Sequence, residues 1–210
     1  MVNEHMSLGT TLTAIAVMAL SIGSASARNF SVSNQNIRAV WTRRNLSEPF
    51  GVTTSCPVTL EGSLHSRTIA KVTYALIGYI TRATVGPPAS CVGGEATILG
   101  GSLPWHVRLL GFDGTLPDIT RLRALLSGGS FKIRTVNGTC LFTTRENTTE
   151  HGLANFNRNV TTGQITSVDS GGEITSNEAC IFGLRIRGRL EGTGSVTALN
   201  PASLIFVRLI

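Results

Sequence analysis

The chain has 210 residues and a formal net charge of +6, and only 14% of its residues are charged, against roughly 25% in an average soluble domain. Serine and threonine, with 19 and 26 residues, fill much of that gap, and a hydroxyl-rich, glycine-rich composition favours exposed β-sheet faces. The 16 Arg that dominate the basic residues are scattered along the chain, so we expect no nucleic-acid partner.

Residues 1–27 have the features of a secretory signal peptide. Residues 12–22 form an apolar run, and Ala25-Ser26-Ala27 offers the small side chains that signal peptidase accepts. The run is shorter than the ~20 apolar residues that a membrane span needs. We therefore predict cleavage after Ala27 and a single mature domain over residues 28–210, without a transmembrane span, that is secreted or held in the cell envelope. The sequence leaves open whether translation starts at Met1 or Met6, because no Lys or Arg precedes the apolar run.

In the mature chain, apolar and polar residues mostly alternate with period two, which is typical of half-buried strands. We predict strands at 30–33, 38–42, 58–64, 96–99, 105–110, 131–134, 141–144, 164–168, 182–190 and 204–210. Residues 68–84 fit a helix or a pair of strands equally well, residues 119–126 favour a strand, and residues 145–160 are polar and suggest a long exposed loop. Asn137-Gly138 predicts a hairpin turn.

Many short strands separated by Gly and Pro turns predict an all-β fold, an antiparallel sandwich or jelly-roll-like domain. Trp105, which follows Leu103-Pro104, is expected to be a core aromatic at one end of it. The sequence does not give the strand order or the oligomeric state.

Four cysteines in an exported chain predict two disulfides. Of the three possible pairings we favour Cys56–Cys91 and Cys140–Cys180, which are neighbours in sequence and close loops of 35 and 40 residues. Zinc is disfavoured, because the sequence has no CxxC or HxxxH spacing.

Two histidines are the best candidates for chemistry. His65 and His106 lie in the polar phase of their predicted strands. If those strands were neighbours, the two imidazoles would share a face with Asp113 or Asp118, as an acid–base or metal site requires. The simpler interpretation is a pair of exposed sheet histidines. The common hydrolase and phosphate-binding motifs are absent from the sequence, so we predict no catalytic residue, cofactor or metal.

Arg185, Arg187 and Arg189 alternate along one predicted strand. They form either a solvated strand face or a stripe that binds an anionic polymer or head groups.

A resemblance rests on several short motifs: residues 55–62 (SCPVTLEG), Cys91, Leu103-Pro104-Trp105, Cys140, and Cys180 with residues 188–192 (GRLEG). This layout resembles uncharacterised secreted proteins of actinobacteria and, more distantly, the secreted alkane-oxidation activator (PraB-like) proteins. The resemblance implies a secreted β-domain without an established catalytic site and an accessory role at the cell surface in uptake of hydrophobic substrates. It defines no functional residues.

The expected function is that of a non-catalytic module that binds an unknown envelope or extracellular ligand. One alternative is a secreted hydrolase that uses His65 or His106 with a nearby carboxylate. The other is a polyanion binder that uses Arg185, Arg187 and Arg189.

Overall fold

The computed structural model describes residues 29–144 and 152–210. The predicted signal peptide, its cleavage site and the alternative start codons lie outside the described residues, as does the first part of the predicted loop at 145–160. No helix in the described part of the chain is long and apolar enough to cross a membrane.

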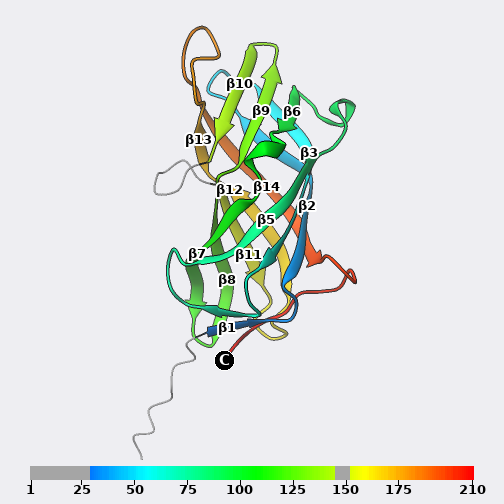
Figure 1. Ribbon diagram of the computed structural model, residues 1–210, viewed down its shortest axis with the longest axis vertical. Coiled ribbons are helices and arrows are strands. Elements are labelled where there is room, and N and C mark those ends of the chain that lie inside the picture. Colours follow the sequence, from blue (N-terminus) through cyan, green and yellow to red (C-terminus); the bar gives the residue numbers. More distant parts are fainter. Residues whose placement is uncertain (1–28, 145–151) are drawn as a thin grey trace, which may run out of the picture.

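The core of the molecule is an antiparallel sheet that closes on itself (Figure 1). Nine strands are joined in the order β12-β11-β8-β7-β5-β3-β2-β14-β13, and a further pairing of β12 with β14 joins all of them except β13 into a ring of eight. The strands of the ring are β2 (Asn36–Ser47), β3 (Thr53–Leu64), β5 (Leu76–Val85), β7 (Trp105–Thr115), β8 (Asp118–Ser127), β11 (Gly152–Arg158), β12 (Ile165–Gly171) and β14 (Arg187–Ala198). The short β13 (Glu173–Thr175) continues beyond β12 along the edge of β14.

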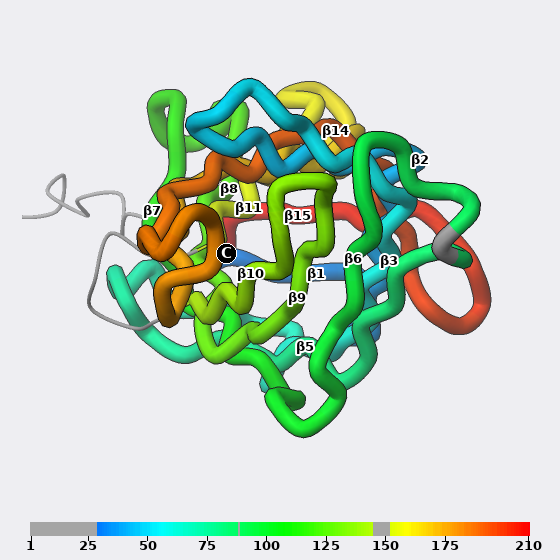
Figure 2. The backbone as a smooth tube through the Cα atoms, turned by 90° about the horizontal axis from the view of Figure 1, so that it is seen from above, coloured from blue at the N-terminus to red at the C-terminus, as the bar shows by residue number. Residues whose placement is uncertain are grey.

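Two small antiparallel sheets cover the ends of this ring. One contains β1 (Asn29–Val32), β4 (Thr68–Ala70) and β15 (Val207–Leu209), and the other contains β6 (Glu95–Ile98), β9 (Ser130–Thr135) and β10 (Gly138–Thr143). In Figure 1, β1 crosses the lower end and β6, β9 and β10 stand at the upper end; Figure 2 looks down on the β9–β10 hairpin. We call the second sheet the upper cap. Two short 3-10 turns, η1 (Pro88–Ser90) and η2 (Gly100–Ser102), flank β6.

The hydrophobic core has two parts. The larger part fills the ring and extends under β1, where Phe30 is fully buried. The Phe30 ring contacts the Phe112 ring edge-to-face, with 5.7 Å between the ring centroids. The smaller part lies between the upper cap and the adjoining ends of β2 and β14, around the fully buried Phe142 and Ile181. Fully burying one such side chain is worth about 1.5–3 kcal/mol, so each cap is held mainly by its apolar inner face.

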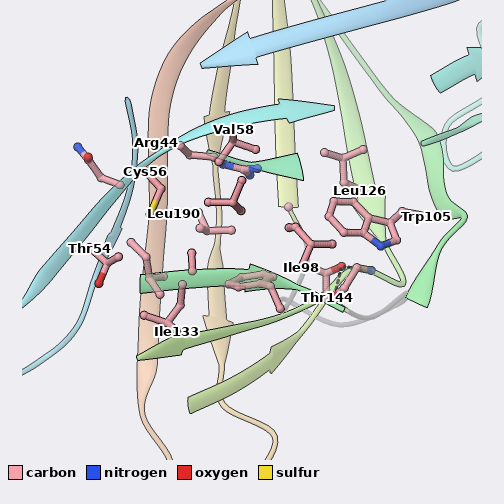
Figure 3. A pocket seen from close by; sticks show the side chains of 17 residues that line it. Arg44, Thr54, Cys56, Val58, Ile98, Trp105, Leu126, Ile133, Thr144 and Leu190 are labelled. Carbon is pink, nitrogen blue, oxygen red and sulfur yellow. Dashed lines mark hydrogen bonds between the residues drawn. The ribbon is translucent and has the colours of Figure 1, made fainter. Parts of the chain in front are cut away.

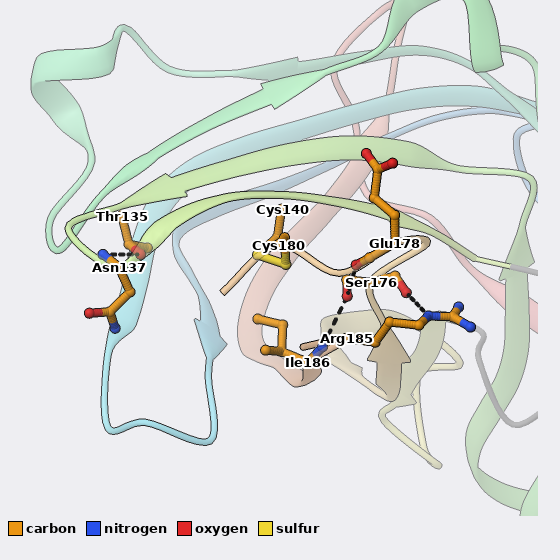
Figure 4. Close-up of a disulfide and its surroundings, with 8 residues drawn as sticks. All are labelled: Thr135, Asn137, Cys140, Ser176, Glu178, Cys180, Arg185 and Ile186. Carbon is orange, nitrogen blue, oxygen red and sulfur yellow. Dashed lines mark hydrogen bonds between the residues drawn. A yellow bond between two sulfur atoms is a disulfide. The ribbon is translucent and has the colours of Figure 1, made fainter. Parts of the chain in front are cut away.

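Two disulfides tie loops to this framework, with the pairing that the sequence favoured. Cys56 of β3 bonds to Cys91, which leads into the upper cap. Cys140 of β10 bonds to Cys180 in the loop before β14 (Figure 4). The predicted all-β class with two disulfides is thus confirmed.

The architecture within that class differs from a sandwich or jelly roll, because one sheet closes through the β12–β14 pairing. Residues 68–84 form two strands, β4 and β5, that pair with other strands and not with each other. The predicted strand at 119–126 is confirmed as β8, and β9 and β10 form the predicted hairpin.

One prediction, the loop at 145–160, is wrong over residues 152–158, which form β11. The polar residues that suggested a loop lie on the outer face of this strand. Asn157 accepts a hydrogen bond from Arg121 Nε and donates hydrogen bonds to Ser167 and Asp169 on the next strand. Ala154 lies on the opposite face and is buried in the core. Cross-strand hydrogen bonds satisfy these polar groups, so a polar composition does not prevent strand formation here.

Candidate functional site

A cavity lies at the upper end of the ring, between its strands and the upper cap (Figure 3). Its volume is about 70 Å³, several times the space that one water molecule needs. The lining is mainly apolar and includes Val58, Ile98, Trp105, Leu126, Phe131 and Leu190. A closed eight-stranded sheet is about the size that leaves room for one small ligand. We call this space the upper cavity.

Most polar groups that line the upper cavity already have partners. Trp105 Nε1 donates a hydrogen bond to Ser102 Oγ at 2.9 Å. Thr144 Oγ1 accepts one from the Gly129 backbone N–H, also at 2.9 Å. The Thr54 hydroxyl has no partner, but it lies against the backbone of the 93–94 loop. These groups therefore serve the fold, and Arg44 is the lining residue that needs a different explanation.

A β-bulge in β2 turns Arg44 toward the inside of the ring. In a regular strand, alternate residues share a face, so Trp41 and Arg44 would point in opposite directions. The register of β2 against β3 shifts between the pairs Trp41↔Val58 and Arg44↔Cys56, which leaves one extra residue in β2. Trp41 and Arg44 therefore face the same way, together with the buried Leu46.

The Trp41 ring lies beside this bulge because two residues of β14 lack side chains. A Cβ on Gly194 would come within 3.0 Å of Trp41 Cδ1 and Cδ2, and within 2.6 Å of the Val40 carbonyl oxygen. One on Gly192 would come within 2.9 Å of the Arg43 carbonyl oxygen. Trp41 Nε1 donates a hydrogen bond to Gly192 O at 3.2 Å. Trp41, Gly192 and Gly194 thus fix the local backbone that positions Arg44.

Arg44 brings a positive charge to the wall of the upper cavity. Part of the residue is exposed, but its Nε is buried and has no hydrogen-bond partner. Within residues 29–144 and 152–210, no acidic side chain forms an ion pair with it. The guanidinium carbon lies 5.2 Å from the centre of the Trp41 ring, within the range of a cation–π contact. In Figure 3 the side chain reaches into the cavity beside Val58.

Burial makes the charged form of this guanidinium less favourable. It lowers the pKa of Arg44 from its ordinary value to about 10, because the surrounding apolar residues solvate a cation poorly. The side chain nevertheless remains protonated at neutral pH. The upper cavity is therefore an apolar space with one cationic hydrogen-bond donor in its wall.

A second cavity of about 60 Å³ lies at the opposite end of the ring, under β1 and β15. Its wall includes Phe30, Leu122, Ile205 and one charged residue, Arg123. Arg123 Nε lies 3.2 Å from Asp113 Oδ1; the two atoms are not aligned as a hydrogen bond, but the distance is that of an ion pair. We call this space the lower cavity. The charge of Arg123 is thus balanced there, whereas no carboxylate of the described residues balances Arg44 at the upper cavity.

The two histidines are not brought together as the hydrolase alternative requires. His65 directly follows β3 and His106 lies on β7, and β5 separates these two strands. Tyr79 of β5 lies between the two imidazoles, and its ring centroid is 4.8 Å from that of His65 and 5.4 Å from that of His106. Asp113 is seven residues beyond His106 on β7, about 23 Å away along an extended strand. Asp118 pairs with Thr115 at that same distant end of the strand. The condition for a shared acid–base or metal site, neighbouring strands with a carboxylate beside the imidazoles, is therefore not met.

The three arginines of the predicted anion-binding stripe are exposed on and just before β14. Arg185 Nε donates a hydrogen bond to the Ser176 carbonyl oxygen at 2.8 Å (Figure 4). Arg187 lies 3.9 Å from Glu173, and Arg189 lies 3.6 Å from Glu191. Two carboxylates thus reduce the positive potential of this stripe, and anion binding there stays a prediction.

Metal chemistry has no evident site in the described residues, where no three His, Cys, Asp or Glu side chains gather closely enough to hold an ion. All four cysteines are in disulfides.

The structure defines an all-β, disulfide-bonded protein with an apolar cavity at one end of a closed antiparallel sheet. Comparisons with protein-family models, with curated proteins and with solved structures found no match to this chain. The resemblance to secreted alkane-oxidation activators therefore stays a prediction.

Sequence reasoning missed Arg44 as a site residue. Arginines are scattered along the sequence, and strict alternation from Trp41 would turn Arg44 outward. The nearby Gly192 and Gly194 on β14 are the only sequence signal of a close backbone approach that we can identify, and they gain meaning only once β14 is known to pair with β2.

Proposed function

We propose that this chain is a non-catalytic binding module that works outside the cytoplasm and holds a small, mainly apolar ligand in the upper cavity. The observation that carries the proposal is the cavity itself, an apolar space of about 70 Å³ between the ring and the upper cap. Ligand sites are commonly concave and apolar, with a few placed polar groups. The upper cavity has this character, and Arg44 is the charged residue in its lining, with a buried Nε that has no hydrogen-bond partner among the described residues.

The proposed location outside the cytoplasm is supported by the two disulfides, which form and persist in oxidising compartments. The apolar run and small residues of the first 27 positions support export independently. An accessory role at the cell surface, as the resemblance to alkane-oxidation activators implies, is compatible with an apolar ligand.

The test uses two short amphiphiles, octanol and octanoate, titrated calorimetrically into the purified disulfide-bonded protein. We expect saturable binding of at least one of them. Ala96→Leu, which adds bulk to the wall of the upper cavity, should abolish this binding. Ala124→Leu places the same change in the wall of the lower cavity and should leave it intact. His65→Ala with His106→Ala is a second control, because both residues lie outside the cavity.

Thermal unfolding of each variant separates loss of binding from loss of folding. Absence of saturable binding of both amphiphiles would refute the proposal. Binding that survives Ala96→Leu but is lost in a folded Ala124→Leu variant would also refute it, because the ligand would then occupy the lower cavity.

A further inference from the structure

The arginines on the strands of the ring differ in whether a carboxylate balances them. Arg38 lies 2.7 Å from Glu61, and Arg123 lies 3.2 Å from Asp113. Arg44 faces the inside of the ring and has no carboxylate partner in the described part of the chain. The N–H of its buried Nε makes no hydrogen bond there.

An unsatisfied cationic donor in an apolar wall is unfavourable for the empty protein. A guanidinium has five N–H groups and no acceptor, so neither a cation nor a hydrocarbon relieves it. The contact with the Trp41 ring compensates part of the charge, but it leaves the in-plane N–H groups without acceptors. An anionic oxygen supplies both the opposite charge and the missing acceptor.

We infer that the ligand of the upper cavity is a small amphiphilic anion, a carboxylate with a short apolar tail, whose head group pairs with the Arg44 guanidinium. This inference rests on the proposed function and names its ligand class. A carboxylate suits the planar fork of arginine, which binds two oxygens at once. The tail would lie along the apolar wall formed by residues such as Val58, Leu126 and Leu190.

The arrangement also explains why the bulge in β2 matters for binding. Without the register shift between Trp41 and Arg44, the guanidinium would face outward, and the upper cavity would lose its cationic donor. The bulge, the Trp41 ring and the two glycines of β14 therefore act as positioning elements, and Arg44 is the residue that contacts the ligand.

The test compares octanoate with octanol, which share a tail and differ in the head group. At neutral pH the wild-type protein should bind octanoate at least about ten-fold more tightly, because a hydrogen bond to a charged group is the stronger one. Arg44→Gln should remove this preference while still binding octanol, and Arg44→Lys should retain part of it. Arg189→Gln, which removes an exposed charge on the outer face of β14, is the control for a general attraction of anions and should leave the preference unchanged.

The outcomes separate this inference from the proposed function. Equal affinity of the wild-type protein for octanoate and octanol would overturn the inference and leave the proposed function standing. Binding of neither compound would overturn both. A preference for octanoate that survives in Arg44→Gln, or that disappears in Arg189→Gln, would overturn the assignment to Arg44. If Arg44→Gln does not fold, the preference for octanoate over octanol is compared between the wild-type protein and Arg44→Lys, and an undiminished preference in Arg44→Lys would overturn the assignment to Arg44.

Discussion

Replacing Arg44 with Met should make the empty protein more stable. Met keeps an unbranched apolar stem but removes the guanidinium, whose Nε is buried without a partner. A cation whose pKa falls to about 10 on folding, well below the ordinary value of arginine, is disfavoured in the folded state by about 3 kcal/mol. Even for buried ion pairs, replacement with apolar residues ranges from neutral to about 4 kcal/mol of stabilisation.

The net gain should be smaller than that figure. Arg44 is partly exposed, so solvent screens some of the charge, and Met loses the cation–π contact with Trp41, which is worth about 0.5–2 kcal/mol. We therefore expect Arg44→Met to gain about 1–2 kcal/mol, which corresponds to a rise in Tm of roughly 2–8 °C for a domain of this size.

Urea unfolding and thermal unfolding of the ligand-free protein at neutral pH measure this change. The matched control is Arg38→Met on the same strand. Arg38 is ion-paired with the largely buried Glu61 at 2.7 Å, so its loss should destabilise the protein by about 0.5–1 kcal/mol. If Arg44→Met destabilises the protein as much as Arg38→Met does, then Arg44 has a partner in the folded state and the argument for an anionic ligand fails.

Two further predictions concern the rest of the molecule. Replacing both Cys140 and Cys180 with Ala should lower the free energy of unfolding in urea by about 2–4 kcal/mol, because their disulfide holds the 176–186 loop against the smaller core. A decrease below experimental error would show that the apolar contacts of Ile181 hold this loop without the disulfide. Glu48 is 6% exposed, its carboxylate oxygens have no partner, and burial raises its pKa. At neutral pH the Glu48→Gln variant should therefore be more stable than the wild-type protein, because the wild-type carboxylate is charged and buried. As the pH falls through the raised pKa toward the ordinary range of Glu, the carboxylate takes up a proton, and the wild-type protein should gain stability relative to the variant. Urea unfolding as a function of pH measures this difference, and a difference that does not change with pH would contradict the assignment.

Some features of this protein follow from the local sequence. Alternation with period two predicted strands such as β7 and β9 because every second side chain of a strand meets the core. The pairing Cys56–Cys91 and Cys140–Cys180 was favoured because neighbours in sequence close the shortest loops. Trp105 was expected to be a core aromatic at one end of the fold, and it is buried at the upper end of the ring.

Other features depend on contacts between residues far apart in the chain. Residues 152–158 were expected to be a loop, because their asparagines look solvated until Arg121 and Asp169 on the neighbouring strands provide partners. The closure of the sheet depends on β12 meeting β14, and that pairing leaves no periodic trace in either strand.

The sequence by itself determined that the chain is all-β and which segments alternate, because these depend on local periodicity. It favoured the observed cysteine pairing, which the structure then showed. Only the tertiary structure decided that the sheet forms a ring, that an apolar space remains under the upper cap, and that Arg44 faces it. The physical reason is that one extra residue in β2 reverses the direction of every side chain after it. The position of that residue is set by how Trp41 packs against Gly192 and Gly194 of β14, more than 140 residues away in the chain.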